Sequence, residues 1–257
     1  MNSPTPPMRI AKCIAERGIC SRRQAEVLIQ EGRVSVNGQK LTTPAHLVSR
    51  KDSILIDGKP LPPLEAPRIW CFYKPKGLIT THNDPQGRST VFSFLKGKYP
   101  SLPHVISVGR LDLNSEGLLL LTTSGSLARY MELPQTKWKR VYRVRVFGSL
   151  NDDIFTHLKK GIIKNKILYK ALDARFETPT SRKTFESSSR NTWIEISLTT
   201  GKNREVRVLL EHFGLQVNRL IRISYGPFML HYLKAGECKE IPFDEFASFF
   251  PKEILHA

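Results

Sequence analysis

The sequence lacks the marks of membrane and secreted proteins. No apolar run approaches the roughly 20 residues that a transmembrane helix requires. The opening residues, Met-Asn-Ser-Pro-Thr-Pro-Pro, contain neither the basic nor the apolar region of a signal peptide. We therefore expect a cytoplasmic protein that does not associate with membranes.

The sequence also lacks the usual signals of metal and cofactor sites. Its four cysteines show no paired short spacing, and no two histidines stand at the spacing of metal ligands. A glycine loop for phosphates and a dinucleotide-binding fingerprint are missing as well. We expect no metal and no cofactor, so that any chemistry must come from side chains alone.

Positive charge is what the sequence has in excess. Lys and Arg number 40 against 23 Asp and Glu, which gives a formal net charge of +17 over 257 residues. This excess predicts a polyanionic partner, and nucleic acid is favoured over a membrane surface. The length allows one sizeable core and a small second module.

The first module, from about residue 9 to residue 58, is predicted to contain two helices and a hairpin. Apolar residues at helical spacing precede Gly18, which ends the first helix. The second helix begins at Ser21, where Gln24 completes a capping box. A short strand then enters a tight turn at Asn37-Gly38, because both central residues of such a turn need positive φ.

Basic residues gather on these helices and turns: Lys12, Arg17, Arg22, Arg23 and Arg33. They could contact an RNA backbone, or they could form an ordinary solvated helix face. The run Lys-x-Ile, Gly, Ser-Arg-Arg, Ala, Ile, Gly-Arg-Val and Val-Asn-Gly resembles the small RNA-binding domain of the ribosomal-protein-S4 type. The resemblance implies an α/β module that recognises folded RNA, with Arg22, Arg23 and Arg33 among its contacts.

A proline-rich stretch over residues 60–67 reads as a stiff linker. We predict a disordered N-terminus over 1–7, the RNA-binding domain over 8–59, a second domain over 68–251 and a C-terminal tail over 252–257. In the second domain, strand patterns at 69–73, 105–108, 118–122, 141–147 and 193–198 are joined by a helical pattern at 206–213. Many strands with few long helices favour an α+β fold with a mixed sheet.

Within the second domain, the segment Gly-Arg-Leu-Asp-Leu-Asn-Ser-Glu-Gly at 109–117 is a short polar loop that runs directly into four leucines. The leucine run is buried, so Asp112 stands at the mouth of a core element, where a carboxylate needs a cation to stay charged. It is therefore a candidate catalyst. The alternative is a turn-forming Asp at the surface, since Asp is an ordinary loop residue.

The motif Gly-Arg-Leu-Asp-x-x-Ser-x-Gly-Leu-Leu is similar to the signature of the bacterial ribosomal RNA pseudouridine synthases. The resemblance implies that Asp112 is the catalytic residue, which starts cleavage of the N-glycosidic bond of a uridine. The detached uracil then turns and rejoins the ribose through C5. No cofactor takes part in that reaction.

Two further motifs resemble those of the same family. Alternation over 139–146 turns Tyr142 inward, where it could be an ordinary core aromatic. The resemblance to a Lys-x-Tyr motif implies instead that Tyr142 stacks on the target base, as such contacts stabilise by about 1–3 kcal/mol per base. Arg140 stands where the family has its lysine, with Lys139 beside it.

The run Gly-Lys-Asn-Arg-Glu-Val-Arg at 201–207 opens the helical pattern. Its resemblance to the family's Gly-Lys-Asn-Arg-Gln-Val-Arg implies that Arg207 pairs with Asp112 and that Val206 packs against the target nucleotide. Lys202 and Arg204 are expected to contact RNA. Glu205 replaces the usual Gln, so we expect weaker RNA contacts at that edge.

Loops upstream add basic residues that match the segments lining the family's RNA cleft. Lys74, Lys76 and Arg88 are expected to grip phosphates, and Arg110 to help extrude the uridine from its stack. The implied architecture is an α+β domain with a mixed, mainly antiparallel sheet, split by a basic cleft and preceded by the small RNA-binding domain.

The expected partner is ribosomal RNA, 23S rather than 16S, either free or in pre-ribosomal particles, and the protein is expected to be a monomer. The segment Asp-Pro-Gln-Gly-Arg-Ser-Thr-Val-Phe resembles that of family members acting on the large subunit, and this resemblance implies 23S RNA. A non-catalytic ribosome assembly factor would explain the charge equally well. A glycosidase would need a second carboxylate, for which only Glu116 is near.

Overall fold

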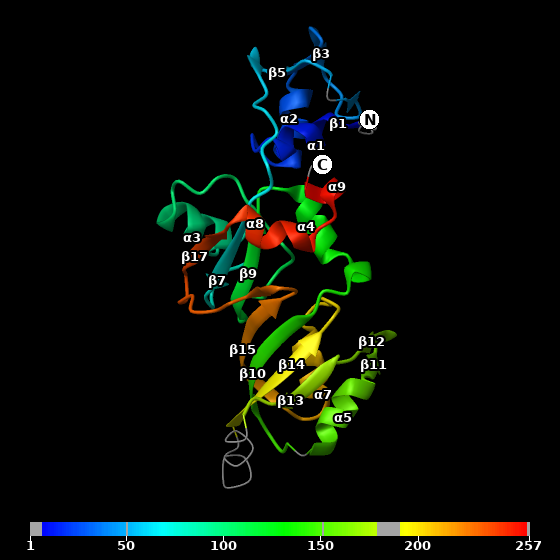
Figure 1. Ribbon diagram of the computed structural model, residues 1–257, viewed down its shortest axis with the longest axis vertical. Coiled ribbons are helices and arrows are strands. Elements are labelled where there is room, and N and C mark those ends of the chain that lie inside the picture. The colour runs from blue at the N-terminus through cyan, green and yellow to red at the C-terminus, as the bar shows by residue number, and fades with distance from the viewer. Residues whose placement is uncertain (1–6, 50, 151, 179–190, 256–257) are drawn as a thin grey trace.

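The computed structural model describes residues 7–49, 51–150, 152–178 and 191–255 of the chain. Most of the predicted disordered N-terminus, residues 1–6, lies outside the described residues. Figure 1 shows a small N-terminal domain joined to a larger second domain by a single extended segment. No helix in the described part is long and apolar enough to cross a membrane.

The small domain has the predicted two helices and hairpin, with further short strands. The Ser21 hydroxyl accepts from the Gln24 backbone N–H while the Gln24 side chain bonds to the Ser21 backbone, which confirms the capping box. Asn37 and Gly38 have φ of 50° and 82°, as the predicted turn requires. Its elements are β1 (Met8–Arg9), α1 (Ile10–Glu16), α2 (Arg22–Gln30), β2 (Val34–Val36), β3 (Gln39–Leu41), β4 (Leu47–Val48), β5 (Ile54–Ile56) and β6 (Lys59–Pro60).

The small domain has its own hydrophobic core, built mainly from the two helices. Ile10, Ile14 and Ile29 are fully buried and meet the strands of a sheet with the order β3-β2-β5-β6. Pro60, the first residue of the predicted linker, pairs with Leu55 in the edge strand β6, where a missing N–H costs no ladder bond. Residues 61–68 then continue without regular structure.

The second domain is built on one large sheet, whose order is β13-β14-β10-β15-β9-β7-β17. All of its pairings are antiparallel except that of β15 with β9, which confirms the predicted mixed, mainly antiparallel α+β fold. The strands are β7 (Ile69–Lys74), β8 (Ile106–Ser107), β9 (Glu116–Thr122), β10 (Arg140–Phe147), β13 (Asp173–Phe176), β14 (Asn191–Leu198), β15 (Gln216–Tyr225), β16 (Phe228–Met229) and β17 (Cys238–Ile241).

The parallel pairing lies at the centre of the large sheet and is very tight. Gly117 of β9 lies opposite Arg222 of β15 with a φ of 100°, and a Cβ at Gly117 would stand 2.3 Å from the Arg222 carbonyl oxygen. Only glycine fits both constraints. The loop that enters β9, residues 108–115, is thereby fixed where the two halves of the sheet join.

Helices cover the two faces of the large sheet unequally. On one side, here named the α7 face, α3 (Val91–Lys98), α5 (Asp152–Lys160) and α7 (Glu205–His212) pack on one apolar cluster. On the other side, named the α4 face, α4 (Gly125–Glu132), α8 (Phe243–Phe246) and α9 (Lys252–Leu255) pack on a second cluster. The chain also forms η1 (Pro134–Thr136), η2 (Ala247–Phe249) and a hairpin of β11 (Ile162–Lys164) with β12 (Ile167–Tyr169).

All five predicted strands and the predicted helix at 206–213 are present within a few residues. The strand expected over 105–108 is reduced to Ile106–Ser107. The central strand β15 was not predicted, because Asn218, Arg219 and Arg222 interrupt its apolar pattern. Part of the predicted C-terminal tail forms α9, which packs on α4 and buries Leu255.

Candidate functional site at the Asp112 loop

Asp112 lies in a loop, residues 108–115, that connects β8 to β9 and is here named the Asp112 loop. Hydrogen bonds hold all five consecutive carbonyls from residue 111 to residue 115. Thr80 Oγ1 donates to Leu111 O at 2.8 Å, Gly77 N to Leu113 O at 2.9 Å and Arg207 Nη2 to Asn114 O at 3.1 Å. The remaining two carbonyls, of residues 112 and 115, are bound by a buried lysine.

That lysine is Lys74, the last residue of β7, whose side chain is 0% exposed. Its Nζ donates to the carbonyls of Pro75, Asp112 and Ser115 at 3.0, 3.1 and 2.9 Å. Burial lowers the pKa of Lys74 to about 8, against the opposing effect of the Asp112 charge. Because the amine is enclosed, the predicted phosphate contact of Lys74 is wrong, and the residue positions the Asp112 loop instead.

The Asp112 carboxylate is partly exposed and makes no ion pair. Within the described residues, no Lys, Arg or His nitrogen lies within 4.0 Å of it. The expected pair with Arg207 is therefore not formed as a direct contact. Arg207 instead donates to the carbonyls of Asn114 and Val217, at 3.1 and 3.0 Å.

Arg207 is nevertheless close enough to Asp112 to feel its charge. Burial lowers the pKa of the Arg207 guanidinium, and the negative charge of Asp112 acts in the opposite direction. The Arg207 Nε is buried and has no hydrogen-bond partner among the described residues. The guanidinium thus anchors the Asp112 loop through main-chain contacts. Its Nε–H group donates to no described residue.

Tyr142 lies on the α7 face, as the alternation in β10 predicts, and it is 8% exposed. Its register partner in β15 is Arg222, which is also buried. Arg222 Nε donates to the Leu118 carbonyl at 2.7 Å, and its charge contributes to the lowered pKa of Lys74. Sequence reasoning missed Arg222, although a lone arginine in the apolar run Leu-Ile-Arg-Ile is itself a signal.

Arg140 does not face the cleft. It is buried, with Nη2 2.6 Å from the Tyr225 hydroxyl and Nη1 2.9 Å from the Thr199 carbonyl. The expectation that Arg140 contacts RNA is wrong, since its guanidinium is enclosed and satisfied by protein groups. It fixes the end of β14, just before the loop that leads to α7.

The loop before α7 and the first turn of α7 carry the predicted cluster of Lys202, Arg204 and Val206. Glu205, whose presence predicted weaker RNA contacts, is buried, and it binds the Thr200 hydroxyl at 2.5 Å and the Lys202 backbone N–H at 3.0 Å. Val206 is 3% exposed in the core under α7, so the expected contact with a nucleotide is not available to its side chain. Arg204 is exposed, 3.7 Å from Glu211.

The remaining predicted RNA contacts are all exposed. Arg22, Arg23 and Arg110 make no ion pair within the described residues. Lys76 lies 3.8 Å from Glu116. Two others already hold a carboxylate: Arg33 binds Asp57 through two hydrogen bonds, and Arg88 binds Asp84, lowering the pKa of that carboxyl to about 2.

Glu116, the other carboxylate near the loop, faces away from Asp112. It receives two hydrogen bonds from Arg219, at 2.8 and 2.9 Å, and one from the Tyr73 hydroxyl at 3.3 Å. Burial raises the pKa of the Glu116 carboxyl, but the bonds and charge of Arg219 outweigh it, and the net shift is downward. Tyr73 and Lys74 are adjacent in a strand and so point to opposite faces, which places Glu116 on the α4 face.

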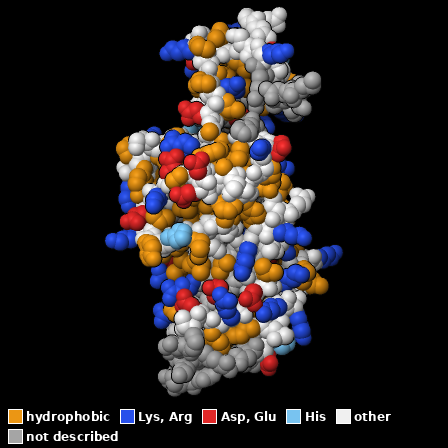
Figure 2. All heavy atoms as spheres, viewed as in Figure 1, with side chains coloured by type: hydrophobic (Ala, Val, Ile, Leu, Met, Phe, Trp, Pro, Cys, Tyr) orange, Lys and Arg blue, Asp and Glu red, His pale blue; other side chains and the backbone are white. Residues whose placement is uncertain are grey.

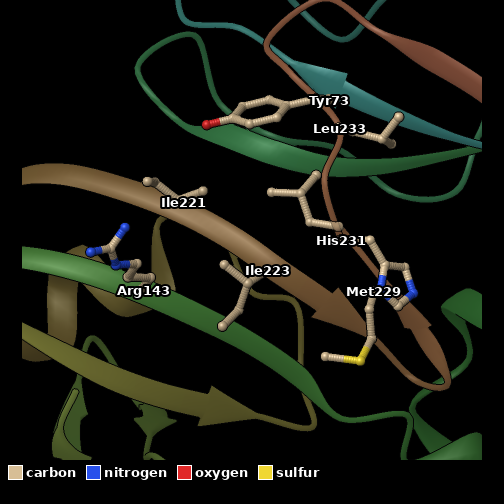
Figure 3. Close-up of a pocket in the computed structure, with 8 residues that line it drawn as sticks. Tyr73, Arg143, Ile221, Ile223, Met229, His231 and Leu233 are labelled. Atoms are coloured by element: carbon tan, nitrogen blue, oxygen red, sulfur yellow. The ribbon is translucent and has the colours of Figure 1, made fainter. Parts of the chain in front are cut away.

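A pocket of about 400 Å³ also lies on the α4 face (Figure 3). Tyr73, Arg143 and Ile221 line it, together with Ile223, Met229, Leu230, His231 and Leu233. Arg143 follows Tyr142 in β10 and therefore points away from it. No predicted site residue lines this pocket, so it is separate from the Asp112 loop.

Comparisons with known proteins match both domains of the chain. A family model described as RNA pseudouridylate synthase matches residues 68–212, and an S4 domain model matches residues 8–54. The chain is 51% identical over 233 residues to a Rickettsia felis protein described as an uncharacterized RNA pseudouridine synthase, covering 91% of this chain and 96% of that one.

The chain is also 39% identical over 231 residues to ribosomal large subunit pseudouridine synthase B of Yersinia pestis, covering 86% of this chain and 68% of the relative. A crystal structure of a pseudouridylate synthase matches with a TM-score of 0.63 at 23% identity. That match covers 95% of this chain and 100% of the other, and it shows that the two proteins share a fold.

Proposed function

The chain belongs to the RNA pseudouridylate synthase family, and from that membership we propose that it converts one uridine of 23S ribosomal RNA into pseudouridine. The reaction is an isomerisation. The bond between uracil N1 and ribose C1′ breaks and a bond between C5 and C1′ forms. The hydrogen on C5 leaves and N1 gains a proton, so atoms and electrons balance without an oxidant or water.

Asp112 starts the cleavage of the N-glycosidic bond in this proposal. The observation that carries it is the combination of a carboxylate that pairs with no described cation and a loop in which every carbonyl from residue 111 to residue 115 is bound. A reactive group must be held within a fraction of an ångström of its working position, and such a loop supplies that rigidity.

Tyr142 and Arg207 assist Asp112. Tyr142 offers its ring to the extruded uracil on the α7 face, where Arg222 lies beside it. Arg207 and Lys74 keep positive charge close to Asp112, and neither forms an ion pair with it. No described cation therefore blocks the approach of a uridine to the carboxylate.

RNA is held by exposed cations rather than by the buried ones. In the second domain these are Lys76, Arg88, Arg110 and Arg204, together with the half-buried Lys202 at the entry to α7. In the small domain, Arg22 and Arg23 extend the contact. The predicted boundaries, 8–59 for the small domain and 68–251 for the second, remain part of this proposal.

The decisive experiment maps pseudouridine in separate 23S and 16S RNAs after incubation with the purified chain. Asp112→Asn keeps the shape of the side chain and removes its charge, so we expect no pseudouridine from it and an unchanged melting temperature. Asp244→Asn, at an exposed carboxylate in α8, should act like the wild type. Pseudouridine formation by Asp112→Asn would overturn the role of Asp112, and a modified site in 16S RNA would overturn the choice of subunit.

A further inference from the structure

The hairpin of β11 and β12 and its flanks form a basic segment outside the Asp112 loop. Residues 159–172 contain five lysines and no acidic residue. Lys159 pairs with Asp173 at 2.7 Å, whereas the other four make no ion pair within the described residues. These four unpaired lysines are Lys160, Lys164, Lys166 and Lys170, and all are exposed.

The turn of this hairpin contains an unusual residue. Lys164 pairs with Ile167, so Asn165 and Lys166 form a two-residue turn, and their φ angles are 52° and 63°. A turn of this kind needs positive φ at both positions, and glycine is the residue that adopts it freely at the second. Lys166 adopts it at a conformational cost.

The chain uses glycine in its two comparable turns. Asn37-Gly38 joins β2 to β3 with φ of 50° and 82°, and Asp57-Gly58 joins β5 to β6 with φ of 49° and 75°. The Asn165-Lys166 turn has the same length and backbone geometry. A lysine retained at the strained position therefore points to a use for its charge.

Contacts place the hairpin beside the proposed site. The Lys202 amine bonds to the Leu168 carbonyl of β12 and lies 5.5 Å from the centre of the Tyr169 ring. Lys202 leads into α7, whose Arg207 holds the Asn114 carbonyl of the Asp112 loop. One loop and one helical turn thus separate the hairpin from Asp112.

The base of the hairpin is anchored and its outer face is open. Ile162 and Tyr169, a cross-strand pair, pack against the core cluster of the α7 face. The next pair, Ile163 and Leu168, points the other way and is 76% and 44% exposed. A fixed base with a charged tip suits a rigid contact element, and Figure 1 shows the hairpin at the rim of the second domain.

We propose that the hairpin of β11 and β12 is a separate RNA-contact element, in which Lys160, Lys164, Lys166 and Lys170 bind phosphates of the RNA next to the target uridine. The occupant is an RNA backbone, because these four cations make no ion pair with any described residue and their segment contains no acidic residue, which complements a polyanion. The proposal rests on the proposed function, since it assigns a further contact with the same substrate.

The test uses the full chain with Lys166→Gly, which removes the charge and relieves the turn. The melting temperature should equal or exceed that of the wild type, while affinity for protein-free 23S ribosomal RNA should fall. The slope of log affinity against log salt should decrease by about 0.7–0.9, the loss of one phosphate contact. A more stable protein that binds RNA less well separates a functional lysine from a structural one.

The matched control is Lys137→Gly. Lys137 is another exposed lysine with positive φ, 51°, but it lies between η1 and β10. It should gain stability in the same way and keep the wild-type affinity and salt slope. Equal losses of RNA affinity in the two variants would mean that affinity depends only on the net charge of the protein, and this would overturn the hairpin assignment.

A triple variant, Lys164→Gln, Lys166→Gln and Lys170→Gln, amplifies the effect and should lower the salt slope by about 2–3. If the wild type forms pseudouridine and the triple variant keeps the wild-type salt slope, the hairpin proposal alone is refuted. A wild type that binds RNA through the hairpin but forms no pseudouridine would refute the proposed function alone. The two proposals therefore fail separately.

Discussion

The two faces of the large sheet use positive charge differently. On the α7 face, buried Lys74, Arg207 and Arg222 donate to main-chain carbonyls. On the α4 face, arginines bind carboxylates: Arg143 with Glu177, Arg175 with Glu195 and Arg219 with Glu116. Figure 2 shows Lys and Arg side chains interspersed with Asp and Glu over one side of the second domain. Because carbonyls carry no net charge, the hydrogen-bond partners of Lys74, Arg207 and Arg222 do not neutralise these three cations.

This difference separates two carboxylates that stand four residues apart. Glu116 is held by Arg219 and Tyr73, so its charge is already balanced and its position fixed by the α4 face. Asp112 has no such partner, while the carbonyl of its own residue is bound by Lys74. The backbone is restrained and the carboxylate is left free, which is what a reactive group requires.

The largest effect should come from removing the cation that positions the loop. Lys74→Met keeps most of the volume but leaves three carbonyls without their donor. We expect the free energy of unfolding to fall by about 3 kcal/mol and the rate of pseudouridine formation to fall about 100-fold. Urea unfolding measures the change in stability. The release of tritium from RNA labelled at uracil C5 measures the rate of pseudouridine formation.

Lys76→Met is the control, because Lys76 is exposed and lies only two residues away. It should unfold like the wild type and, at saturating RNA, react within a few-fold of its rate, because the phosphate contact proposed for Lys76 affects RNA affinity. If Lys74→Met were active at the wild-type rate while Lys76→Met was inactive, Lys74 would not position the loop.

A smaller effect should appear at alkaline pH. Burial lowers the pKa of Lys74 to about 8, so the folded chain releases this proton at lower pH than the unfolded chain. Between about pH 8 and pH 10 the unfolded state holds more protons, and the contribution of Lys74 to the free energy of unfolding rises with pH. Activity should move the opposite way, because a neutral amine has two N–H groups for three carbonyls.

The rate should therefore fall about tenfold per pH unit well above pH 8, at constant ionic strength. Lys76→Met should show the same alkaline limb. A wild-type rate that stays level up to about pH 9.5 would contradict the role given to the Lys74 charge, provided that the RNA remains intact at that pH.

Several features of the fold could be predicted from the sequence alone. Local rules predicted the Ser21 capping box and the Asn37-Gly38 turn, because each depends on residues within a few positions. Alternation in β10 likewise predicted that Tyr142 points inward. Motif resemblance then predicted the family, since several motifs occur in order along the chain.

Long-range contacts are what the sequence could not supply. Lys74 and Arg140 were expected at the RNA surface, but segments 38 and 59 residues away along the chain enclose their side chains. Arg207 was expected to bind the Asp112 carboxylate, and it binds the Asn114 carbonyl instead. A buried cation looks like an exposed one in sequence until its partners are known.

A modest effect is expected from Glu116→Gln. The amide keeps some hydrogen bonding to Arg219 but loses the ion pair, and the partly exposed guanidinium can turn to water. The free energy of unfolding should fall by about 1 kcal/mol, with the rate of pseudouridine formation within about threefold of wild type. Loss of activity as complete as that of Asp112→Asn would mean that both carboxylates react, and the two faces would no longer differ in function.

The smallest effect should come from Arg175→Gln on the α4 face. Its side chain is 64% exposed and pairs with Glu195 at 2.7 Å, a surface ion pair whose loss should cost less than about 0.5 kcal/mol. Because Glu195 already balances its charge, RNA affinity and its salt slope should stay unchanged, unlike those of Lys166→Gly. A salt slope lowered by about 0.7–0.9 would show that Arg175 also binds a phosphate and that the α4 face takes part in RNA binding.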